Sequence, residues 1–279
     1  MKRMAFLALA IASFTSLWAQ SKFPDGFLAE ENRPDAYVWL PEPPKLTGAD
    51  FTYDFYYYQW GRLKRDEGGV GEMALKDESA PLNEVFGETL DVPLDEVHMP
   101  ETLLLLQRAV TDANDVNKKV KDRYERKRPF AQFNEPSLKP EEDDVEANTF
   151  SYPSGHSSRG WMSALILATV DPEKAEELFL RARLYALNRV ICGHHWKTDI
   201  DASMMLSAGL FATIVCTEEY QAQLVKARAE YNAIKSGTDT KAPKVEHRTS
   251  GPAYAIDGTQ ATEATHGIVI QNGQKTIWK

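Results

Sequence analysis

The feature that most restricts the fold of this chain is a helical spacing of its apolar residues over most of its length. Aromatic and aliphatic side chains recur every three or four positions, first through Phe51, Tyr56, Trp60 and Leu63, then through Leu103, Leu106, Val110 and Val116. Apolar residues at this interval form one face of an α-helix, whereas half-buried strands alternate with a period of two. No alternation of strand and helix units is seen, so the sequence predicts an all-α helical bundle.

Later segments continue the pattern. Helices are expected from about Ser154 through Ile166, from Pro172 towards Arg189, from Ile200 to Cys216 and from Glu218 to Lys235. Asp171 before Pro172 has the form of an N-cap followed by proline in the first helical position. The acidic stretch after Pro129 lacks an apolar period, which predicts a surface loop leading to Pro153.

Four parts of the chain differ in composition. Residues 1–19 have a positive start, an apolar stretch and a small residue at the end, as in a secretory signal peptide, although an uncleaved anchor fits the same pattern. Residues 20–50 are rich in proline and predict an extended N-terminal arm. Residues 51–236 form the helical domain, and residues 237–279 read as a linker followed by a small β-hairpin-like tail.

The formal net charge is -9, which argues against nucleic acid as a partner. Seven basic residues between Lys118 and Arg128 are interrupted by Asp122 and Glu125, so most of them are interpreted as a solvated helix face. After residue 19, the apolar stretches of the chain are too short for a membrane span. The mature protein is expected to be soluble and exported, to the periplasm or outside the cell.

Two cysteines, Cys192 and Cys216, remain in the mature chain. Export permits a disulfide, but both residues lie in apolar, helical surroundings. Two buried free thiols are therefore favoured over a bridge.

A first candidate site pair is Lys121 with Arg128, followed by Pro129 as a helix stop. The two cations are seven positions apart, which is two helical turns, so on one helix they would project from the same face towards one anion. When this pair is taken alone, two exposed cations on a charged helix are the favoured interpretation.

The second candidate segment is Pro153-Ser154-Gly155-His156. Glycine allows a ligand to approach the backbone, and a helix that starts here directs free N–H groups at an anion. Ser154 adds a hydroxyl group and His156 an imidazole.

The third segment runs from Asn188 to Asp199 and contains Arg189, His194 and His195. On a helix, Asp199 would orient the ring of His195 and leave its other nitrogen bare for attack. Arg189 reaches His195 only if the helix breaks near Gly193. A divalent metal bound by His194, His195 and Asp199 is an alternative, which the neighbouring cations disfavour. Three permanent cations around two imidazoles suit a phosphoryl group.

These three segments, in this order and at these distances, resemble the signature motifs of the type 2 phosphatidic acid phosphatase superfamily. The stretches SYPSGHSSRGW, NRVICGHHWKTDIDAS, YERKRPF and QWGRLKRD are more narrowly similar to the secreted bacterial class A non-specific acid phosphatases. The similarity extends from about residue 36 to residue 234. It implies a helical bundle of the acid phosphatase and vanadium haloperoxidase type, small phosphomonoesters as substrates, inorganic phosphate as product, and a tendency to form homo-oligomers.

The resemblance also implies a mechanism without metal or cofactor. His195 would attack phosphorus to form a phosphohistidine, Asp199 would support it, and His156 would protonate the leaving group and then activate water. The phosphate oxygens would be held by the remaining motif residues, namely Lys121, Arg128, Ser154, Gly155 and Arg189.

Two positions depart from this pattern or lack a role in it. The superfamily usually has serine where this chain has Asn188, which leaves the local geometry open, and His194 is expected to be a partly exposed residue at the rim. A vanadate-dependent haloperoxidase and a non-catalytic phosphate-binding module remain alternatives. The end of the chain, GIVIQNGQKTIWK, resembles C-terminal elements of the type IX secretion route, and an ordinary hairpin fits it as well.

Overall fold

The computed structural model describes residues 24–237 and, beyond them, residues 253–255, 267–271 and 274–278. The expected signal peptide and most of the expected linker lie outside these residues. In chain order the helices are α1 (Phe51–Lys64), α2 (Val70–Ser79), α3 (Leu82–Leu90), α4 (Pro100–Tyr124), α5 (Pro129–Phe133), α6 (Asp143–Glu146), α7 (Gly155–Val170), α8 (Ala175–Cys192), α9 (Lys197–Ile214) and α10 (Glu218–Lys235). Three short 3-10 helices cover Glu30–Asn32, Ala36–Val38 and Pro172–Lys174.

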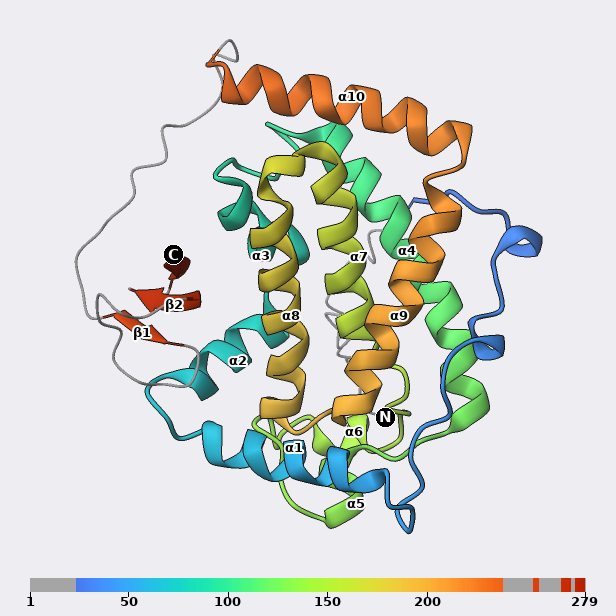
Figure 1. Ribbon diagram of the computed structural model, residues 1–279, viewed down its shortest axis with the longest axis vertical. Coiled ribbons are helices and arrows are strands. Elements are labelled where there is room, and N and C mark those ends of the chain that lie inside the picture. The colour runs from blue at the N-terminus through green and yellow to red at the C-terminus, as the bar shows by residue number, and fades with distance from the viewer. Residues whose placement is uncertain (1–23, 238–252, 256–266, 272–273, 279) are drawn as a thin grey trace, which may run out of the picture.

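The helix α7 is the centre of the bundle. It packs against α4, α8 and α9, which run beside it, while α1 and α10 cross opposite ends of the layer (Figure 1). Met162, Ile166 and Leu167 of α7 are completely buried in the main core. A helix that is apolar on most of its surface is stable only when other helices surround it, and this explains the position of α7.

The prediction of an all-α fold is confirmed. The last helix begins and ends where the sequence predicts it, and Asp171 caps the turn at Pro172 by accepting a hydrogen bond from the Glu173 N–H. At the C-terminal end, β1 (Ala253–Ala255), β2 (Gly267–Gln271) and β3 (Gln274–Trp278) form an antiparallel sheet in the order β1-β2-β3, where a small hairpin-like element was expected. Ile268 pairs with Ile277 in its register.

A buried carboxylate fastens the N-terminal arm to α4. Asp112 accepts hydrogen bonds from the backbone N–H groups of Phe27 and Leu28, at 2.6 and 3.3 Å, and pairs with the Arg33 guanidinium at 3.2 Å. The Phe27 ring lies edge-on to Tyr220 of α10. Because buried backbone N–H groups need acceptors, Asp112 substitutes for the secondary structure that the proline-rich arm lacks.

The two cysteines are both free thiols, as expected, but only Cys192 is buried. The prediction of burial was wrong for Cys216, because it lies just beyond the C-terminal end of α9, where the chain turns towards α10 at the surface.

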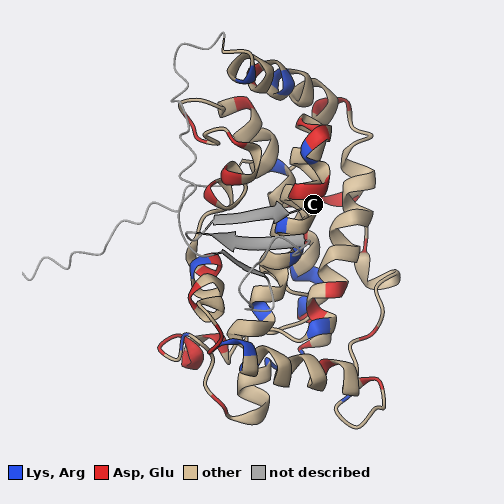
Figure 2. Ribbon diagram, turned by 60° about the vertical axis from the view of Figure 1, so that its left-hand side comes forward, with Lys and Arg blue, Asp and Glu red and all other residues tan. Residues whose placement is uncertain are grey.

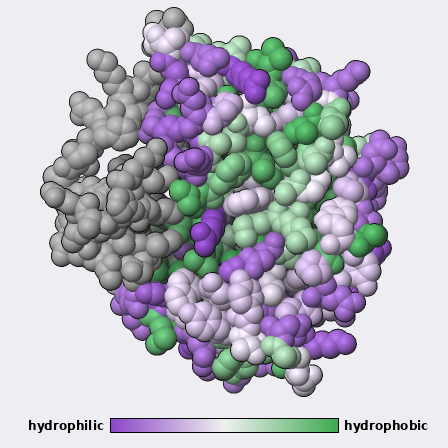
Figure 3. All heavy atoms as spheres, viewed as in Figure 1, coloured by the Kyte–Doolittle hydropathy of each residue, from purple (hydrophilic) through white to green (hydrophobic). Residues whose placement is uncertain are grey.

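The surface carries both signs of charge. Lys and Arg positions are interspersed with Asp and Glu positions on the helices (Figure 2). Apolar side chains gather across the middle of the face seen in Figure 3, with hydrophilic ones around them. Among the described residues no single helix has the length and apolarity of a membrane span, whereas α9 and α10 together, with a bend of 97° between them, have both.

Candidate active site

The first motif is not one helix. The helix α4 ends at Tyr124, Glu125 adopts a left-handed conformation with φ 47°, and Arg128 is the N-cap residue of α5. Pro129 therefore begins a helix, where the sequence analysis expected it to end one. Lys121 and Arg128 share a region because the chain turns between them, and the shared helix face that was predicted does not exist.

Lys121 is the cation with the most perturbed ionisation. Its ammonium group donates a hydrogen bond to the Phe150 carbonyl oxygen at 2.7 Å. Burial, followed by the charge of Arg128, lowers its pKa to about 7. A group with this pKa is a cation in acidic solution and loses that charge as the pH rises above neutrality.

Arg128 makes the most contacts of the predicted cations. Its guanidinium pairs with the Glu146 carboxylate at 2.7 Å and donates to Thr149 Oγ1 at 2.8 and 2.9 Å. On the other side, Nη1 donates to the His194 carbonyl oxygen and to His195 Nε2, each at 3.1 Å. The acidic stretch that was expected to be a surface loop thus also supplies partners to this arginine.

The second motif forms the start of α7. Ser154 is the N-cap residue, and its completely buried hydroxyl oxygen accepts hydrogen bonds from the Ser157 N–H at 3.2 Å and hydroxyl at 2.9 Å. At Gly155 a Cβ would have a single neighbour within 4 Å, the Asn117 side-chain oxygen at 3.7 Å. The Ser154 N–H donates to the Asp199 carbonyl oxygen at 3.2 Å, so the second and third motifs are in direct contact.

The third motif contains the break that the sequence analysis required. The helix α8 ends at Cys192, Gly193 follows with φ 83°, and α9 begins at Lys197. A left-handed residue at this position is the common glycine end of a helix. The turn allows Arg189, His194 and His195 to lie in one buried region, where the three residues are 5%, 0% and 3% exposed.

His195 lies between a carboxylate and a guanidinium. Its Nδ1 is 3.4 Å from Asp199 Oδ2, and its Nε2 is 3.1 Å from Arg128 Nη1. A guanidinium can only donate hydrogen bonds, so Nε2 must be the acceptor and the ring proton must be on Nδ1, facing Asp199. Burial, followed by the charges of Arg128 and Arg189, lowers the pKa of His195 well below its ordinary value. The ring is therefore neutral, and its unprotonated Nε2 accepts a hydrogen bond from Arg128.

Asp199 connects this ring to the start of α9. Its Oδ2 also accepts the Trp196 N–H at 2.8 Å, and its Oδ1 accepts from Arg126 at 2.7 Å. Burial raises the pKa of Asp199, while Arg126 and the Trp196 N–H act in the opposite direction.

Arg189 contacts the His194 ring, whereas Arg128 contacts the His194 backbone carbonyl oxygen, and Arg189 also has a partner that the sequence did not indicate. It forms an ion pair with Glu78 at the end of α2, and its Nη2 donates to His194 Nδ1 at 2.9 Å. The prediction that His194 is a partly exposed rim residue was wrong, because its side chain is completely buried against Phe130 and Arg189. His194 and His195 thus face different partners. In the described part of the chain no three His, Cys, Asp or Glu side chains are grouped to hold a metal ion.

His156 lies in the first turn of α7 and is held by residues of α2, α7 and α8. Its Nδ1 accepts from Arg159 at 3.3 Å, its Nε2 lies 3.1 Å from the Asp77 carbonyl oxygen, and its ring stacks on Tyr185 with centroids 4.5 Å apart. Burial, followed by the charge of Arg159, lowers its pKa to about 3. Within the residues that the structure describes, the hydrogen bonds and ring contact of His156 are with Asp77, Arg159 and Tyr185, and none of them is with His195.

Asn188 binds to the carboxylate of Asp77. Its amide donates to Asp77 Oδ2 at 2.6 Å, and Arg181 donates to both oxygens of the same carboxylate at 2.6 and 3.0 Å. Asn188, at the position where the superfamily usually has serine, therefore holds Asp77 near the end of α2. The backbone carbonyl oxygen of Asp77 is the one that contacts His156.

Sequence reasoning missed Arg126, Asp54, Asp77 and Glu78. Arg126 was included in the basic segment interpreted as a solvated face, yet its side chain is only 10% exposed and pairs with two buried carboxylates. Its position between Lys121 and Arg128 was the available signal. The three acidic residues lie in α1 and α2, far from the motifs in sequence, and no local pattern marks them.

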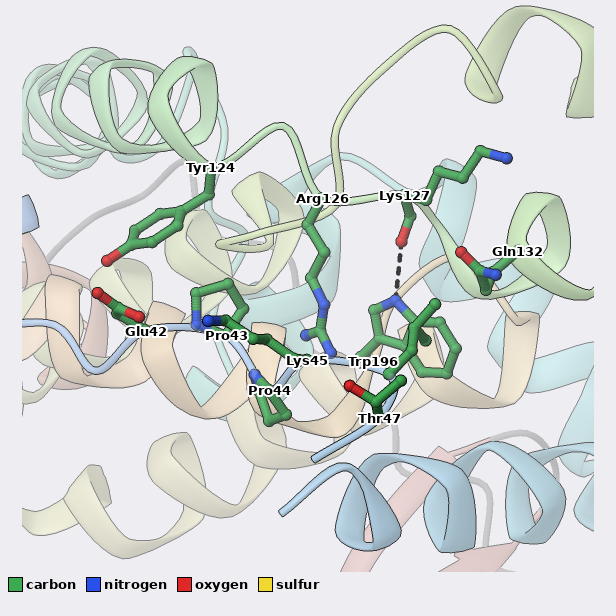
Figure 4. Close-up of a pocket in the computed structure, with 11 residues that line it drawn as sticks. Glu42, Pro43, Pro44, Lys45, Thr47, Tyr124, Arg126, Lys127, Gln132 and Trp196 are labelled. Carbon is green, nitrogen blue, oxygen red and sulfur yellow. Dashed lines mark hydrogen bonds between the residues drawn. The ribbon is translucent and has the colours of Figure 1, made fainter. Parts of the chain in front are cut away.

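A pocket of about 410 Å³ lies under the N-terminal arm, between residues 42–47 and the segment that joins α4 to α5 (Figure 4). Arg126 and Trp196 line it, and the Trp196 indole N–H donates to the Lys127 carbonyl oxygen at 2.8 Å. None of the predicted phosphate-binding residues is part of its lining. The pocket therefore lies next to Arg126, which pairs with Asp199, and is separate from the predicted anion site.

Residues 102–222, which run from α4 into α10 and contain the three motif segments, match the family model of the PAP2 superfamily. The chain is 35% identical to a non-specific acid phosphatase of Providencia stuartii over 213 residues, which are 75% of this chain and 86% of that protein.

Two further relatives have similar names. A non-specific acid phosphatase of Salmonella typhimurium is 31% identical over 230 residues, 81% of this chain and 90% of that protein. An acid phosphatase of Zymomonas mobilis is 29% identical over 147 residues, 53% of this chain and 56% of that protein. The chain belongs to the PAP2 superfamily and, within it, to the bacterial non-specific acid phosphatases.

Proposed function

We propose that this protein is an acid phosphatase that hydrolyses small phosphomonoesters through a phosphohistidine intermediate. The observation that carries the proposal is the setting of His195, a buried neutral ring with Nδ1 facing Asp199 and an unprotonated Nε2 that contacts Arg128. A nucleophile needs such an unprotonated nitrogen, and its carboxylate neighbour stabilises the positive ring that forms on attack. The names of the relatives support the same activity.

The reaction proceeds in two displacements. Arg128 Nη1 exchanges His195 Nε2 for a phosphate oxygen, and the freed Nε2 lone pair attacks phosphorus. The bond from phosphorus to the ester oxygen breaks, and the leaving alkoxide takes a proton from His156. Water then gives a proton back to His156 and attacks phosphorus, the bond from phosphorus to Nε2 breaks, and inorganic phosphate leaves.

The cations stabilise the charge on the transferring phosphoryl group. Lys121, Arg128 and Arg189, with Ser154 and the Gly155 N–H, bind its oxygens, so that the chain supplies the charge that metal ions supply in other phosphotransferases. The donors of Arg128 and Arg189 that face Glu146 and Glu78 in the free protein turn to the phosphate.

His156 must be protonated to act as an acid, although it is neutral in the free protein. A phosphate dianion beside the ring favours its charged form and raises its pKa from about 3. The ring also has to exchange its contact with the Asp77 carbonyl group for the leaving oxygen.

The same proposal includes the parts of the chain and the location and assembly of the enzyme. Residues 1–19 direct export and are removed, residues 20–50 form the arm, residues 51–236 form the catalytic domain and residues 237–279 a linker and tail. The enzyme acts in the periplasm or outside the cell, as a homo-oligomer, without nucleic acid as a partner. Mass spectrometry of the protein recovered from its native compartment should show an N-terminus after Ala19.

Hydrolysis of p-nitrophenyl phosphate by the wild type and by His195→Ala tests the proposal. The wild type should turn over in acidic buffer, and the variant should retain its circular dichroism spectrum and lose activity by a factor on the order of 10³ or more. A wild type that binds phosphate but hydrolyses no ester would overturn the proposal in favour of a binding module. Vanadate with bromide and peroxide should give no halogenation, and brominated product would favour the haloperoxidase alternative.

A further inference from the structure

A buried ionic cluster lies behind the pair of His195 and Asp199. Arg126 Nη1 donates to Asp199 Oδ1 at 2.7 Å, and its Nη2 donates to Asp54 Oδ2 at 2.6 Å. Both carboxylates are completely buried and the guanidinium lies over the Trp196 ring, 5.2 Å from its centroid. Figure 4 shows the Arg126 side chain extending from the segment between α4 and α5 towards Trp196.

Three separate parts of the fold meet in this cluster. Asp54 comes from α1, Arg126 from the segment after α4, and Asp199 from the first turn of α9. Thr198 connects them, because its N–H and hydroxyl group donate to Asp54 at 2.8 and 2.7 Å and its hydroxyl oxygen accepts from Arg126 at 2.8 Å. The start of α9 is thereby fixed against α1 by polar contacts on both Thr198 and Asp199.

The two oxygens of the Asp199 carboxylate contact different partners. Oδ2 faces His195 Nδ1 and accepts the Trp196 N–H, whereas Oδ1 is occupied by Arg126. A carboxylate held at one oxygen cannot rotate, so the other oxygen stays directed at the imidazole ring. Among the described residues, Arg126 is also the only permanent cation in direct contact with Asp199, so its removal would leave this carboxylate without a paired charge.

We propose that Arg126 is a positioning residue for the nucleophile, which holds the Asp199 carboxylate anionic and aimed at His195, and that Asp54 moderates this support by sharing the same guanidinium. The inference rests on the proposed function, since it assigns a role within that reaction. Arg126 touches neither the phosphoryl group nor His195 in this arrangement, and it acts through Asp199.

The charges around Asp199 determine the direction of the expected pH effects. The ionisable groups that face it are Arg126, Asp54, His195, Lys121, Arg128 and Tyr152. Arg126 lowers the pKa of Asp199 and Asp54 raises it. Losing the cation therefore favours protonation of Asp199 at higher pH, and losing the Asp54 charge favours the anion down to lower pH.

The test compares kcat and kcat/KM for p-nitrophenyl phosphate across pH in Arg126→Met, Asp54→Asn and Thr198→Val. Arg126→Met should lower kcat on the order of 10- to 100-fold with a much smaller change in KM, and should move the acid limb of the profile to higher pH. Asp54→Asn should move the acid limb to lower pH. Thr198→Val, which removes a hydroxyl group and no charge, should leave the limb in place, and Arg126→Lys should recover part of kcat.

A purely structural role predicts a different result, since both charge variants would then lose activity without opposite shifts. Shifts in the same direction, or unchanged limbs in folded variants, overturn the inference. If Arg126→Met does not fold, the comparison of Asp54→Asn with Thr198→Val is sufficient. An acid limb of Asp54→Asn that does not move to lower pH than that of Thr198→Val contradicts the proposal. A wild type without hydrolysis would instead refute the proposed function, so the two failures are distinguishable.

Discussion

At the scale of single residues, Lys121 links anion binding to pH. Its pKa of about 7 in the free protein means that one cation of the predicted anion site is lost as the pH rises through neutrality. Below that value the charge is present, and phosphate should bind more strongly than at higher pH. An enzyme with this site should work best in acid because its lysine is buried, independently of the ionisation of its histidines.

Lys121→Arg tests this link, because a guanidinium stays charged at every working pH. In the wild type, kcat/KM should fall up to about tenfold per pH unit above pH 7, and in the variant this alkaline limb should move to higher pH or vanish. Lys121→Met serves as the control and should be poor at every pH. An alkaline limb that stays in place in Lys121→Arg would assign it to another group.

Glu78 is the second residue whose charge we expect to affect anion binding. Its carboxylate pairs with Arg189 and lies 3.5 Å from His194, so an incoming phosphate must compete with it for the same guanidinium. Glu78→Gln should lower the inhibition constant of inorganic phosphate several-fold. It should also lower the stability of the phosphate-free protein, because a buried charge loses its partner.

Glu67→Gln is the matched control for this prediction, since Glu67 pairs with Lys64 at the surface of the molecule. It should change neither phosphate inhibition nor the melting temperature by more than a small amount. Unchanged phosphate inhibition in Glu78→Gln would show that Glu78 does not compete with the ligand.

The residues that sequence could identify are those in local motifs. Lys121, Arg128, Ser154 and Arg189 follow from spacing and residue type, and their roles remain predictions. Asp54 and Glu78 could not be identified, because each reaches the site only through packing of α1 or α2 against α8 and α9. The seven-residue spacing of Lys121 and Arg128 was explained incorrectly, since the left-handed turn at Glu125 has no strong sequence signal: glycine is absent there.

At the scale of elements, the contact between α7 and α8 positions His156. Gly160 lets Tyr185 approach so closely that a Cβ there would lie 2.4 Å from the ring. The same Tyr185 ring stacks on His156 at an interplanar angle of 16°. Helical periodicity predicted both helices, but a glycine in a helix interior does not reveal which ring it admits, so this contact required the structure.

Gly160→Ala should therefore affect both stability and catalysis. The added methyl group has to displace Tyr185, which costs about 1–3 kcal/mol of unfolding free energy as overpacking and shifts the ring beneath His156. Chemical denaturation and kcat measure the two effects. Gly209→Ala is the comparison, since its Cβ would meet Trp39 of the arm at 3.2 Å, away from the site. Equal losses of kcat in both variants would contradict a specific link from Gly160 to His156.

At the scale of the whole molecule, the bundle buries histidines that its working pH would charge. Burial lowers the pKa of His156 and of His194 to about 3, against an ordinary value of about 6.5. Between these two values the unfolded chain binds a proton at each position and the folded protein does not. The contribution of these two histidines to stability is thus complete above pH 6.5 and is lost as the pH falls towards 3, by about 1.4 kcal/mol per pH unit for each histidine.

Urea denaturation between pH 7 and pH 4 measures this slope. Inorganic phosphate should reduce it, because an anion bound beside the rings raises their pKa in the folded protein and lets them take up protons without unfolding. His194→Gln should remove about 1.4 kcal/mol per pH unit from the slope. His98→Gln, which removes a histidine next to Asp95 outside the site, should leave that part of the slope intact. A free energy of unfolding that stays level down to pH 4 in the absence of phosphate would mean that the buried rings take up protons in the folded state, and that the site is already charged before its ligand arrives.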